Sequence, residues 1–172
     1  GVLYLMDGKI YRAVRKSSKN TAWEAVSVSG TAYVPTTTIS AAPTGGGTSY
    51  EAVNLLTAKR INTFIGDGTA TQFKVDATDL DETAVTAEVN GSAVTVSAVN
   101  RSTGLVTLAA APANGNGLAN VSIAFAKTVS GHADKINKCR FAGLYGGKND
   151  TRVFLSGNPD EPDCDWQSGL YD

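Results

Sequence analysis

The sequence has few of the side chains that most enzymes use for catalysis. Its 172 residues include one histidine, His132, and two cysteines, Cys139 and Cys164. The cysteines are too far apart for the C-x-x-C pattern of a dithiol redox site, and a zinc site needs about four Cys or His ligands in paired spacings. We therefore expect a protein that is not an enzyme and that has no catalytic residues, no metal and no cofactor.

Charge of either sign is also scarce. Charged residues make up 18% of the chain, and 15 Lys and Arg nearly balance 16 Asp and Glu, which leaves a net charge of −1. A nucleic-acid-binding module usually has a clear basic excess, so we expect no nucleic-acid partner. No apolar run approaches the roughly 20 residues that a membrane helix needs, and no signal peptide is visible, so we expect no membrane partner.

Glycine, by contrast, is abundant, with 18 residues, and small or β-branched residues dominate the rest. This composition, interrupted by frequent Gly and Asn, predicts an all-β fold with many tight turns. No window has the sustained apolar spacing of an amphipathic helix. The best candidate for a short helix is residues 50–61.

The middle of the chain predicts a β-hairpin with a defined register. Residues 85–89 and 94–98 alternate apolar and polar side chains on either side of Asn90-Gly91. An Asn-Gly pair favours the two-residue type I′ turn, which needs positive φ at both positions. With that turn, Val89 faces Ser92, residue 87 faces residue 94 and residue 85 faces residue 96, which places the apolar side chains on one face.

Further short strands follow the same pattern. Strands are predicted at 72–75, 105–108 and 121–126, with turns at 66–69, 101–104 and 114–117. Several short strands with short connections are typical of a small antiparallel, Ig-like β-sandwich, which we predict over residues 62–127.

The two flanks, 1–61 and 128–172, are also β-rich but differ from the middle. Asp7-Gly8 predicts a hairpin between 2–6 and 9–14, and a further strand is predicted at 152–156. We interpret the sandwich as an insertion between two flanks that pack together into a second β unit.

Four strings in the flanks resemble structural proteins of bacteriophages and of prophages of Gram-positive bacteria. They are YVPTTTI (33–39), PTGGG (43–47), VNLLTAKRIN (53–62) and NDTRVFLSGNP (149–159). The middle, 64–125, is similar to the small Ig-like sandwiches that are often inserted in phage tail and baseplate proteins. The resemblance covers nearly the whole chain, and Ala58 stands where the family pattern often has Pro.

The resemblance implies a non-enzymatic virion protein that is made in the host bacterial cytoplasm. Within the virion, it favours a place in the tail. It implies assembly through contacts with other virion structural proteins and a homo-oligomer in the particle. The family's proteins are longer, so this chain would be a piece of one, and its flanks would be part of a propeller-like unit. An alternative from another class is a surface adhesion or carbohydrate-binding module with a glycan receptor, because fold does not determine function. A cell-wall hydrolase fragment is a third and weaker hypothesis.

Several titratable residues are candidate sites, but their spacing favours a structural role. His132 and Asp134 are separated by a single residue in the chain and lack an associated nucleophile, so general acid–base catalysis is not favoured. Two acidic stretches of the chain are candidates for calcium binding. Calcium needs six to eight oxygen ligands, and neither stretch has the spacing of an EF-hand. These stretches comprise Asp76, Asp79, Asp81 and Glu82, and Asp160, Glu161, Asp163 and Asp165.

The remaining candidates are basic, aromatic or thiol side chains. A basic patch lacks the interleaved aromatics of a single-strand-binding surface and is interpreted as solvated; it comprises Lys9, Arg12, Arg15, Lys16 and Lys19. Four aromatic residues of the flanks are candidates for sugar stacking but are more typical of core packing: Trp23, Tyr33, Tyr145 and Trp166. Cys139 and Cys164 are expected to be free thiols, because phage proteins assemble in a reducing cytoplasm.

Overall fold

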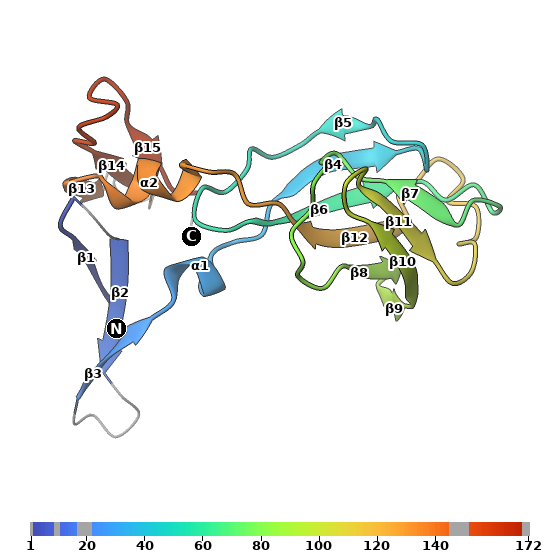
Figure 1. Ribbon diagram of the computed structural model, residues 1–172, viewed down its shortest axis with the longest axis horizontal. Helices are drawn as coiled ribbons and strands as arrows, with labels where there is room; N and C mark the ends of the chain where they lie inside the picture. The colour runs from blue at the N-terminus through green and yellow to red at the C-terminus, as the bar shows by residue number, and fades with distance from the viewer. Residues whose placement is uncertain (1, 9–10, 17–21, 145–151, 170–172) are drawn as a thin grey trace. The chain divides into compact units, whose positions relative to one another are not determined.

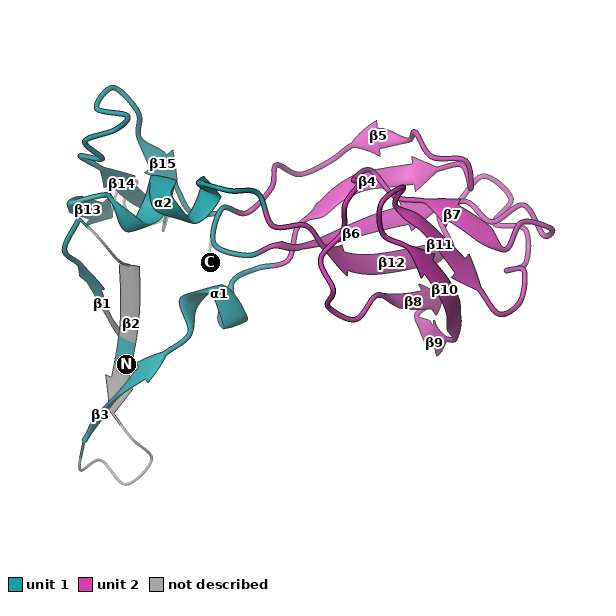
Figure 2. Cartoon of the chain, viewed as in Figure 1, with its two compact units in different colours: residues 1–33, 55–57, 129–172 teal, residues 34–54, 58–128 magenta. Residues whose placement is uncertain are grey.

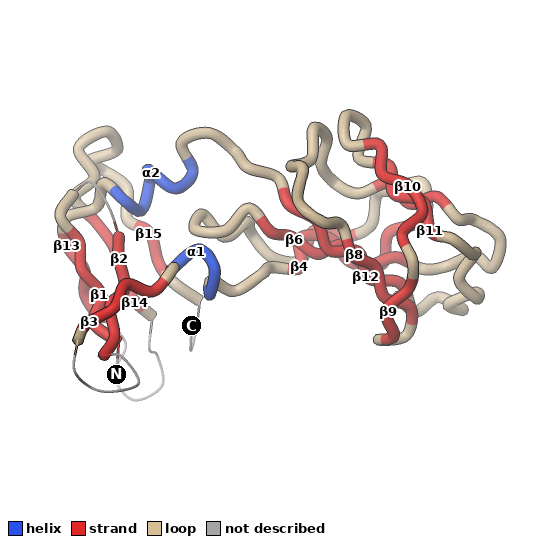
Figure 3. The backbone as a smooth tube through the Cα atoms, turned by 60° about the horizontal axis from the view of Figure 1, so that its bottom comes forward, coloured by secondary structure: helices blue, strands red, loops and turns tan. Residues whose placement is uncertain are grey.

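The computed structural model describes residues 2–8, 11–16, 22–144 and 152–169. Strands dominate this part of the chain (Figures 1 and 3). Its two helices, α1 (Val28–Thr31) and α2 (His132–Asn137), are only four and six residues long. The all-β fold class predicted from the sequence is therefore confirmed.

The chain forms two compact units, which Figure 2 shows in different colours. Unit 1 comprises residues 1–33, 55–57 and 129–172, and unit 2 comprises residues 34–54 and 58–128. The two ends of the chain thus share one unit, and the middle forms the other. These boundaries differ from the predicted segments 1–61, 62–127 and 128–172, because residues 34–54 belong to the central unit.

Unit 2 consists of two β-sheets. The larger has six strands in the order β5 (Thr48–Ser49), β4 (Thr36–Ala41), β6 (Lys59–Phe64), β12 (Val121–Ala126), β8 (Thr86–Val89) and β9 (Ser92–Val94). The smaller has three strands in the order β10 (Val96–Asn100), β11 (Leu105–Leu108) and β7 (Gln72–Lys74). The predicted strands 72–75, 105–108 and 121–126 correspond to β7, β11 and β12.

The β8–β9 hairpin has the predicted turn and register at its tip. Val89 pairs with Ser92, and Asn90 and Gly91 have φ values of 50° and 76°. The outer part of the prediction is wrong, because Val96 does not pair with residue 85. Val96 begins β10 and pairs with Leu108 in the smaller sheet. The chain therefore changes sheets at residue 95, which brings its next strand to the opposite side of the core.

One strand pair departs from the predicted antiparallel arrangement. β4 pairs with β6 in parallel, with two irregularities in register. Residues 42–58 connect these strands and include β5, which returns antiparallel to β4. Gly47 permits this close return: it has φ +85°, and an added Cβ would lie 2.5 Å from the Ile39 carbonyl oxygen. Only glycine fits without displacing the β4 backbone.

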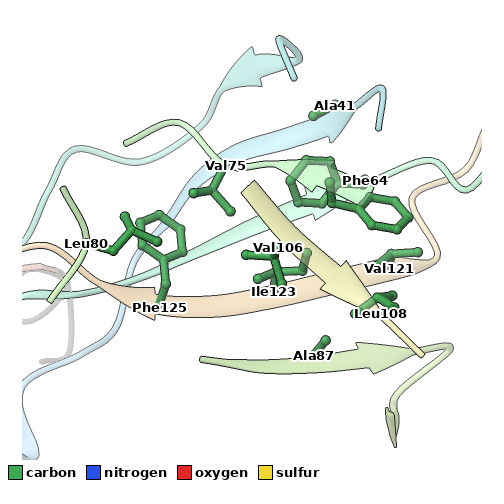
Figure 4. Packing of buried hydrophobic residues seen from close by; sticks show 11 residues of the cluster. Ala41, Phe64, Val75, Leu80, Ala87, Val106, Leu108, Val121, Ile123 and Phe125 are labelled. Atoms are coloured by element: carbon green, nitrogen blue, oxygen red, sulfur yellow. The ribbon is translucent and has the colours of Figure 1, made fainter. Parts of the chain in front are cut away.

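The core of unit 2 lies between the two sheets (Figure 4). Phe64 and Ile123 of the larger sheet and Phe73 and Val106 of the smaller sheet are fully buried. The Phe64 and Phe73 rings meet edge to face at a centroid distance of 5.3 Å. Each large apolar side chain buried in this way contributes about 1.5–3 kcal/mol relative to exposure. The β-sandwich character predicted from the sequence rests here on strands such as β11 and β12, in which buried residues alternate with less buried ones over most of the strand.

Residues 50–61 do not form the predicted helix. Residues 50–58 lie in loops and turns, and Lys59 begins β6. Leu55 and Leu56 pack against the small core of unit 1, whereas β6 belongs to the larger sheet of unit 2. Because the apolar side chains of this segment belong to two different cores, no single helical face buries them.

Unit 1 contains two three-stranded antiparallel sheets. Their strands are β1 (Val2–Met6), β2 (Tyr11–Lys16) and β3 (Trp23–Val26), and β13 (Phe141–Leu144), β14 (Val153–Ser156) and β15 (Trp166–Gln167). A small core of Ile136, Cys139 and Leu155 receives Met6 from β1 and Trp166 from β15. The two ends of the chain therefore contribute side chains to the same core.

Candidate functional site

His132 and Asp134, which the sequence indicates to be structural, lie in α2 (His132–Asn137). The Asp134 carboxylate faces Lys138, with 3.6 Å between Oδ2 and Nζ, as an i, i+4 ion pair on the helix surface. His132 lies at the start of the helix, and its backbone N–H donates to the Val129 carbonyl oxygen. The carboxylate is thus engaged with a lysine, which supports the structural interpretation of these residues.

Two members of the C-terminal acidic stretch form ion pairs with α2 and the residue that follows it. Asp160 accepts from the Lys138 ammonium at 2.5 Å, and Glu161 lies 3.1 Å from the Lys135 ammonium. The hydrogen bond from Lys138 to Asp160 raises the pKa of Lys138 above its usual value. These contacts hold the acidic turn against α2.

A buried amide completes this arrangement. Asn158 is 2% exposed, and its side-chain N–H groups donate to the Lys135 and Asp134 carbonyl oxygens at 3.2 and 3.4 Å. Its side-chain oxygen accepts from the Asp160 backbone N–H at 3.0 Å. A pocket lies beside this network, and its wall includes two lysines, Lys135 and Lys138, and three carboxylates, Asp134, Asp160 and Glu161. Both lysines are engaged in ion pairs with these carboxylates, so most of the charge on the wall is paired within the protein.

Both cysteines are free thiols, as expected from the sequence. Cys139 is fully buried, and its thiol donates to the Lys135 carbonyl oxygen at 3.2 Å. Burial raises the pKa of Cys139, and the negative charge of Asp165 adds to that effect. A protonated, inaccessible thiol is a poor nucleophile. Cys164 is exposed.

The acidic residues that follow β7 are hydrogen-bonded within unit 2. The Asp76 carboxylate accepts from the Thr37 hydroxyl at 2.6 Å, and Asp81 accepts from the Thr128 hydroxyl at 2.7 Å. Glu82 lies 3.0 Å from the Arg101 guanidinium. Across the described ranges, no three His, Cys, Asp or Glu side chains gather in a way that could hold a metal ion.

The basic patch lies largely outside what the structure describes. Lys9 and Lys19 are outside the described residues, and only the backbone of Arg12, Arg15 and Lys16 is described, in β2.

The candidate sugar-stacking aromatics have different environments. Trp166 packs against the small core of unit 1, whereas Trp23 and Tyr33 are 59% and 51% exposed. Tyr145 lies outside the described residues. Trp23 is therefore the candidate with the most accessible indole ring.

The most conspicuous exposed feature of unit 1 is the strand β13, which sequence reasoning missed. It pairs with β14 along one edge, and within the described residues no strand pairs with its other edge. All four of its residues are exposed, and Phe141 and Leu144 are 65% and 79% exposed. An edge strand with unpaired backbone groups and apolar side chains is a template for pairing with another chain. Its sequence, Phe-Ala-Gly-Leu, lacks the apolar–polar alternation that would have indicated a strand.

The outer face of the larger sheet in unit 2 is a second candidate contact surface. The strand register places Thr63, Ser122 and Glu88 across one row, and Ile61, Ala124 and Thr86 across the next. Glu88 is the one charged residue in these two rows. Four of the six residues in these rows, Thr63, Ser122, Ala124 and Thr86, have short side chains.

Comparison with known proteins leaves the chain's family open. It matches no family model, no curated protein and no solved structure. Neither of the two described helices is long and apolar enough to cross a membrane.

Proposed function

We propose that this chain is a non-enzymatic structural protein of a bacteriophage or prophage particle and that it acts by contact with neighbouring subunits. Its place in the particle is the tail. The observation that carries this proposal is the exposed edge of β13. Pairing of this edge with a strand of a neighbouring subunit would satisfy its backbone groups and cover Phe141 and Leu144. The partners are other virion structural proteins, including further copies of this chain.

The charge and the candidate sites of the chain support a contact role. Interface cores are depleted of charged residues, and both β13 and the outer face of the larger sheet have little charge. The acidic residues that are candidates for catalysis or calcium binding are largely engaged by lysines, threonines or Arg101 within their own unit. Repetition in a symmetric particle would multiply weak edge contacts into avidity.

A pair of leucine variants tests the role of β13. Leu144 and Leu118 are 79% and 76% exposed, but Leu144 is on the edge strand and Leu118 is in a turn. Leu144→Lys places a charge on the edge, and we expect it to weaken self-association or co-assembly measured by sedimentation velocity. Leu118→Lys is the matched control and should leave association unchanged. Equal effects of the two variants, or a wild-type chain that remains monomeric and binds no co-expressed neighbour, would contradict the proposal.

The phage assignment has its own test in the gene order around the locus. We expect genes for portal, tape-measure or lysin proteins on either side. A locus with no phage genes on either side would overturn the viral assignment. It would not overturn the proposed contact through the edge of β13.

The exposed indole of Trp23 favours one alternative, a carbohydrate-binding module. An exposed aromatic ring offers an apolar face with a polar edge, as binding surfaces often do. Saturable binding on a glycan array that is lost in Trp23→Ala would support this alternative. Trp166→Ala is a poorer test, because Trp166 packs in the core of unit 1 and its loss affects stability.

A further inference from the structure

Unit 2 contains three Asn-Gly pairs in exposed turns. They are Asn90-Gly91, Asn114-Gly115 and Asn116-Gly117, and all three asparagines are exposed. In an Asn-Gly pair, the glycine backbone nitrogen is able to attack the asparagine side-chain carbonyl carbon, because glycine has no side chain to hinder the approach. The reaction needs that nitrogen to be free of other partners and the backbone to be able to rotate.

The Asn114-Gly115 pair is held in an unreactive arrangement. The Gly115 N–H donates to the Gly66 carbonyl oxygen at 2.8 Å, so the attacking nitrogen is engaged. The Asn114 side-chain oxygen accepts from the Asn116 backbone N–H at 2.7 Å, which fixes the orientation of the target amide. An added Cβ at Gly115 would lie 2.3 Å from the Leu118 carbonyl oxygen, which shows how closely this backbone is enclosed.

The other two pairs are open. Asn90 and Asn116 both have φ 50°, and the glycines that follow them also have positive φ. No atom lies within 4 Å of an added Cβ at Gly91 or Gly117. Within the described ranges, neither glycine N–H has an acceptor among the hydrogen bonds of the structure. The nitrogen and the amide are therefore both available, and the glycine has room to rotate.

We propose that Asn90 and Asn116 are sites of spontaneous modification to aspartate and isoaspartate, and that Asn114 is protected. The glycine nitrogen forms a bond to the asparagine Cγ, and the bond from Cγ to Nδ2 breaks. The amide nitrogen leaves as ammonia and takes the proton of the glycine nitrogen, which leaves a cyclic imide. Water then opens the imide at either carbonyl and yields aspartate or isoaspartate.

The modification at Asn90 changes the hairpin that it closes. Each conversion replaces a neutral amide with a carboxylate, and isoaspartate also adds a methylene to the backbone. The two-residue turn at Asn90-Gly91 determines the register in which Val89 faces Ser92. An added methylene at this point is incompatible with that turn and releases the tip of β8 and β9.

Peptide mapping of the intact folded chain tests this proposal. The protein is incubated at mildly alkaline pH, and conversion at each asparagine is followed by mass spectrometry, with an isoaspartyl methyltransferase as the probe for isoaspartate. We expect conversion at Asn90 and Asn116 to be roughly tenfold faster or more than at Asn114, because a hydrogen-bonded N–H must open before it reacts. The same incubation in urea is the control, and there the three rates should converge.

A glutamine variant at residue 90 separates the two reactive sites. In Asn90→Gln the side chain is one methylene longer and cannot form the five-membered imide, so conversion at residue 90 should stop while residue 116 still converts. Conversion of Asn114 as fast as of the other two in the folded chain would overturn the proposal, as would no conversion at Asn90 and Asn116. A rate difference that persists in urea would also overturn it, because the sequence would then explain the difference without the fold.

Discussion

At the scale of single residues, the most deeply buried polar side chain in the described structure is Asn62. It is 1% exposed and lies on β6. Its amide N–H donates to the Thr37 hydroxyl at 3.0 Å, and its side-chain oxygen accepts from the Asp76 backbone N–H at 2.8 Å. One side chain thus links β4, β6 and the residues after β7.

Replacement of Asn62 should therefore destabilise unit 2. We expect Asn62→Ala to lower the free energy of unfolding by about 2 kcal/mol, because it leaves buried donors and acceptors without partners. The control is Asn100→Ala, which removes hydrogen bonds to Ser102 and Thr103 in an exposed turn and should cost less than about 1 kcal/mol. Urea denaturation compares the two, and equal losses would contradict the role given to burial.

Asp67 gives the stability of the turn at 66–69 a pH dependence. Backbone N–H groups of Ala70 and Thr69 donate to its carboxylate and hold the pKa of Asp67 below its usual 3.8. A lowered folded-state pKa means that this contribution is present above 3.8 and is lost as pH falls through the folded value. The loss of stability in Asp67→Ala should therefore be present at neutral pH and shrink in acid.

Urea denaturation at neutral and acidic pH measures this effect for Asp67→Ala. Asp67→Ser keeps an oxygen acceptor that does not titrate, so its stability relative to Asp67→Ala should not depend on pH. A wild-type advantage over Asp67→Ala that is unchanged in acid would refute the hydrogen-bond explanation.

The candidate acids show what residue-level sequence reasoning provides and what it misses. Their spacing in the sequence does not suit catalysis or calcium binding, and this alone is enough to interpret them as structural. The partners of these acids cannot be predicted in the same way. Lys138 is 22 residues from Asp160 in the chain, and Thr37 is 39 residues from Asp76. Such pairs depend on tertiary structure, which a single sequence does not display.

At the scale of elements, local chemistry made some strands predictable and others not. The β8–β9 tip follows from Asn90-Gly91 and alternating side chains, both within a few residues. The parallel pairing of β4 with β6 spans residues 42–58 and has no local signal. β13 was missed because Phe141 and Leu144 flank two small residues and are both exposed, so no buried face shapes its pattern.

Two glycines with the same backbone conformation allow a matched test of turn geometry. Gly104 and Gly91 have φ +69° and +76°, but an added Cβ at Gly104 would lie 2.0 Å from the Ala77 carbonyl oxygen, whereas Gly91 faces open space. Gly91→Ala should cost about 1–2 kcal/mol for the left-handed conformation alone. Gly104→Ala should cost more by roughly 2 kcal/mol, because the backbone of a neighbouring segment must also move. Equal losses of unfolding free energy in urea denaturation would contradict this, because they would show that the Ala77 backbone moves away at no cost.

At the scale of the whole molecule, the two units have separate cores. The core of unit 2 contains eleven buried hydrophobic residues, including Phe64, Phe73 and Ile123, whereas that of unit 1 contains Ile136, Cys139 and Leu155. Insertion of one β unit into another was predictable from the contrast between flanks and middle. The inclusion of residues 34–54 in unit 2 was not, because it depends on the parallel β4–β6 pair.

Separate cores predict separate responses to mutation. Phe73→Ala should destabilise unit 2 by about 3–5 kcal/mol, and hydrogen exchange should rise in residues 34–54 and 58–128 but not in α2 or β14. Leu155→Ala is the reciprocal variant and should raise exchange in α2 and β14 only. Faster exchange throughout the chain in both variants would show that the units unfold together.

The contrast between the two thiols has a practical consequence. Because Cys139 is enclosed and Cys164 is exposed, a maleimide reagent should label the native chain at a single position without any substitution. A gold or fluorescent tag at Cys164 would then report by electron or light microscopy where this chain lies in any assembly that contains it.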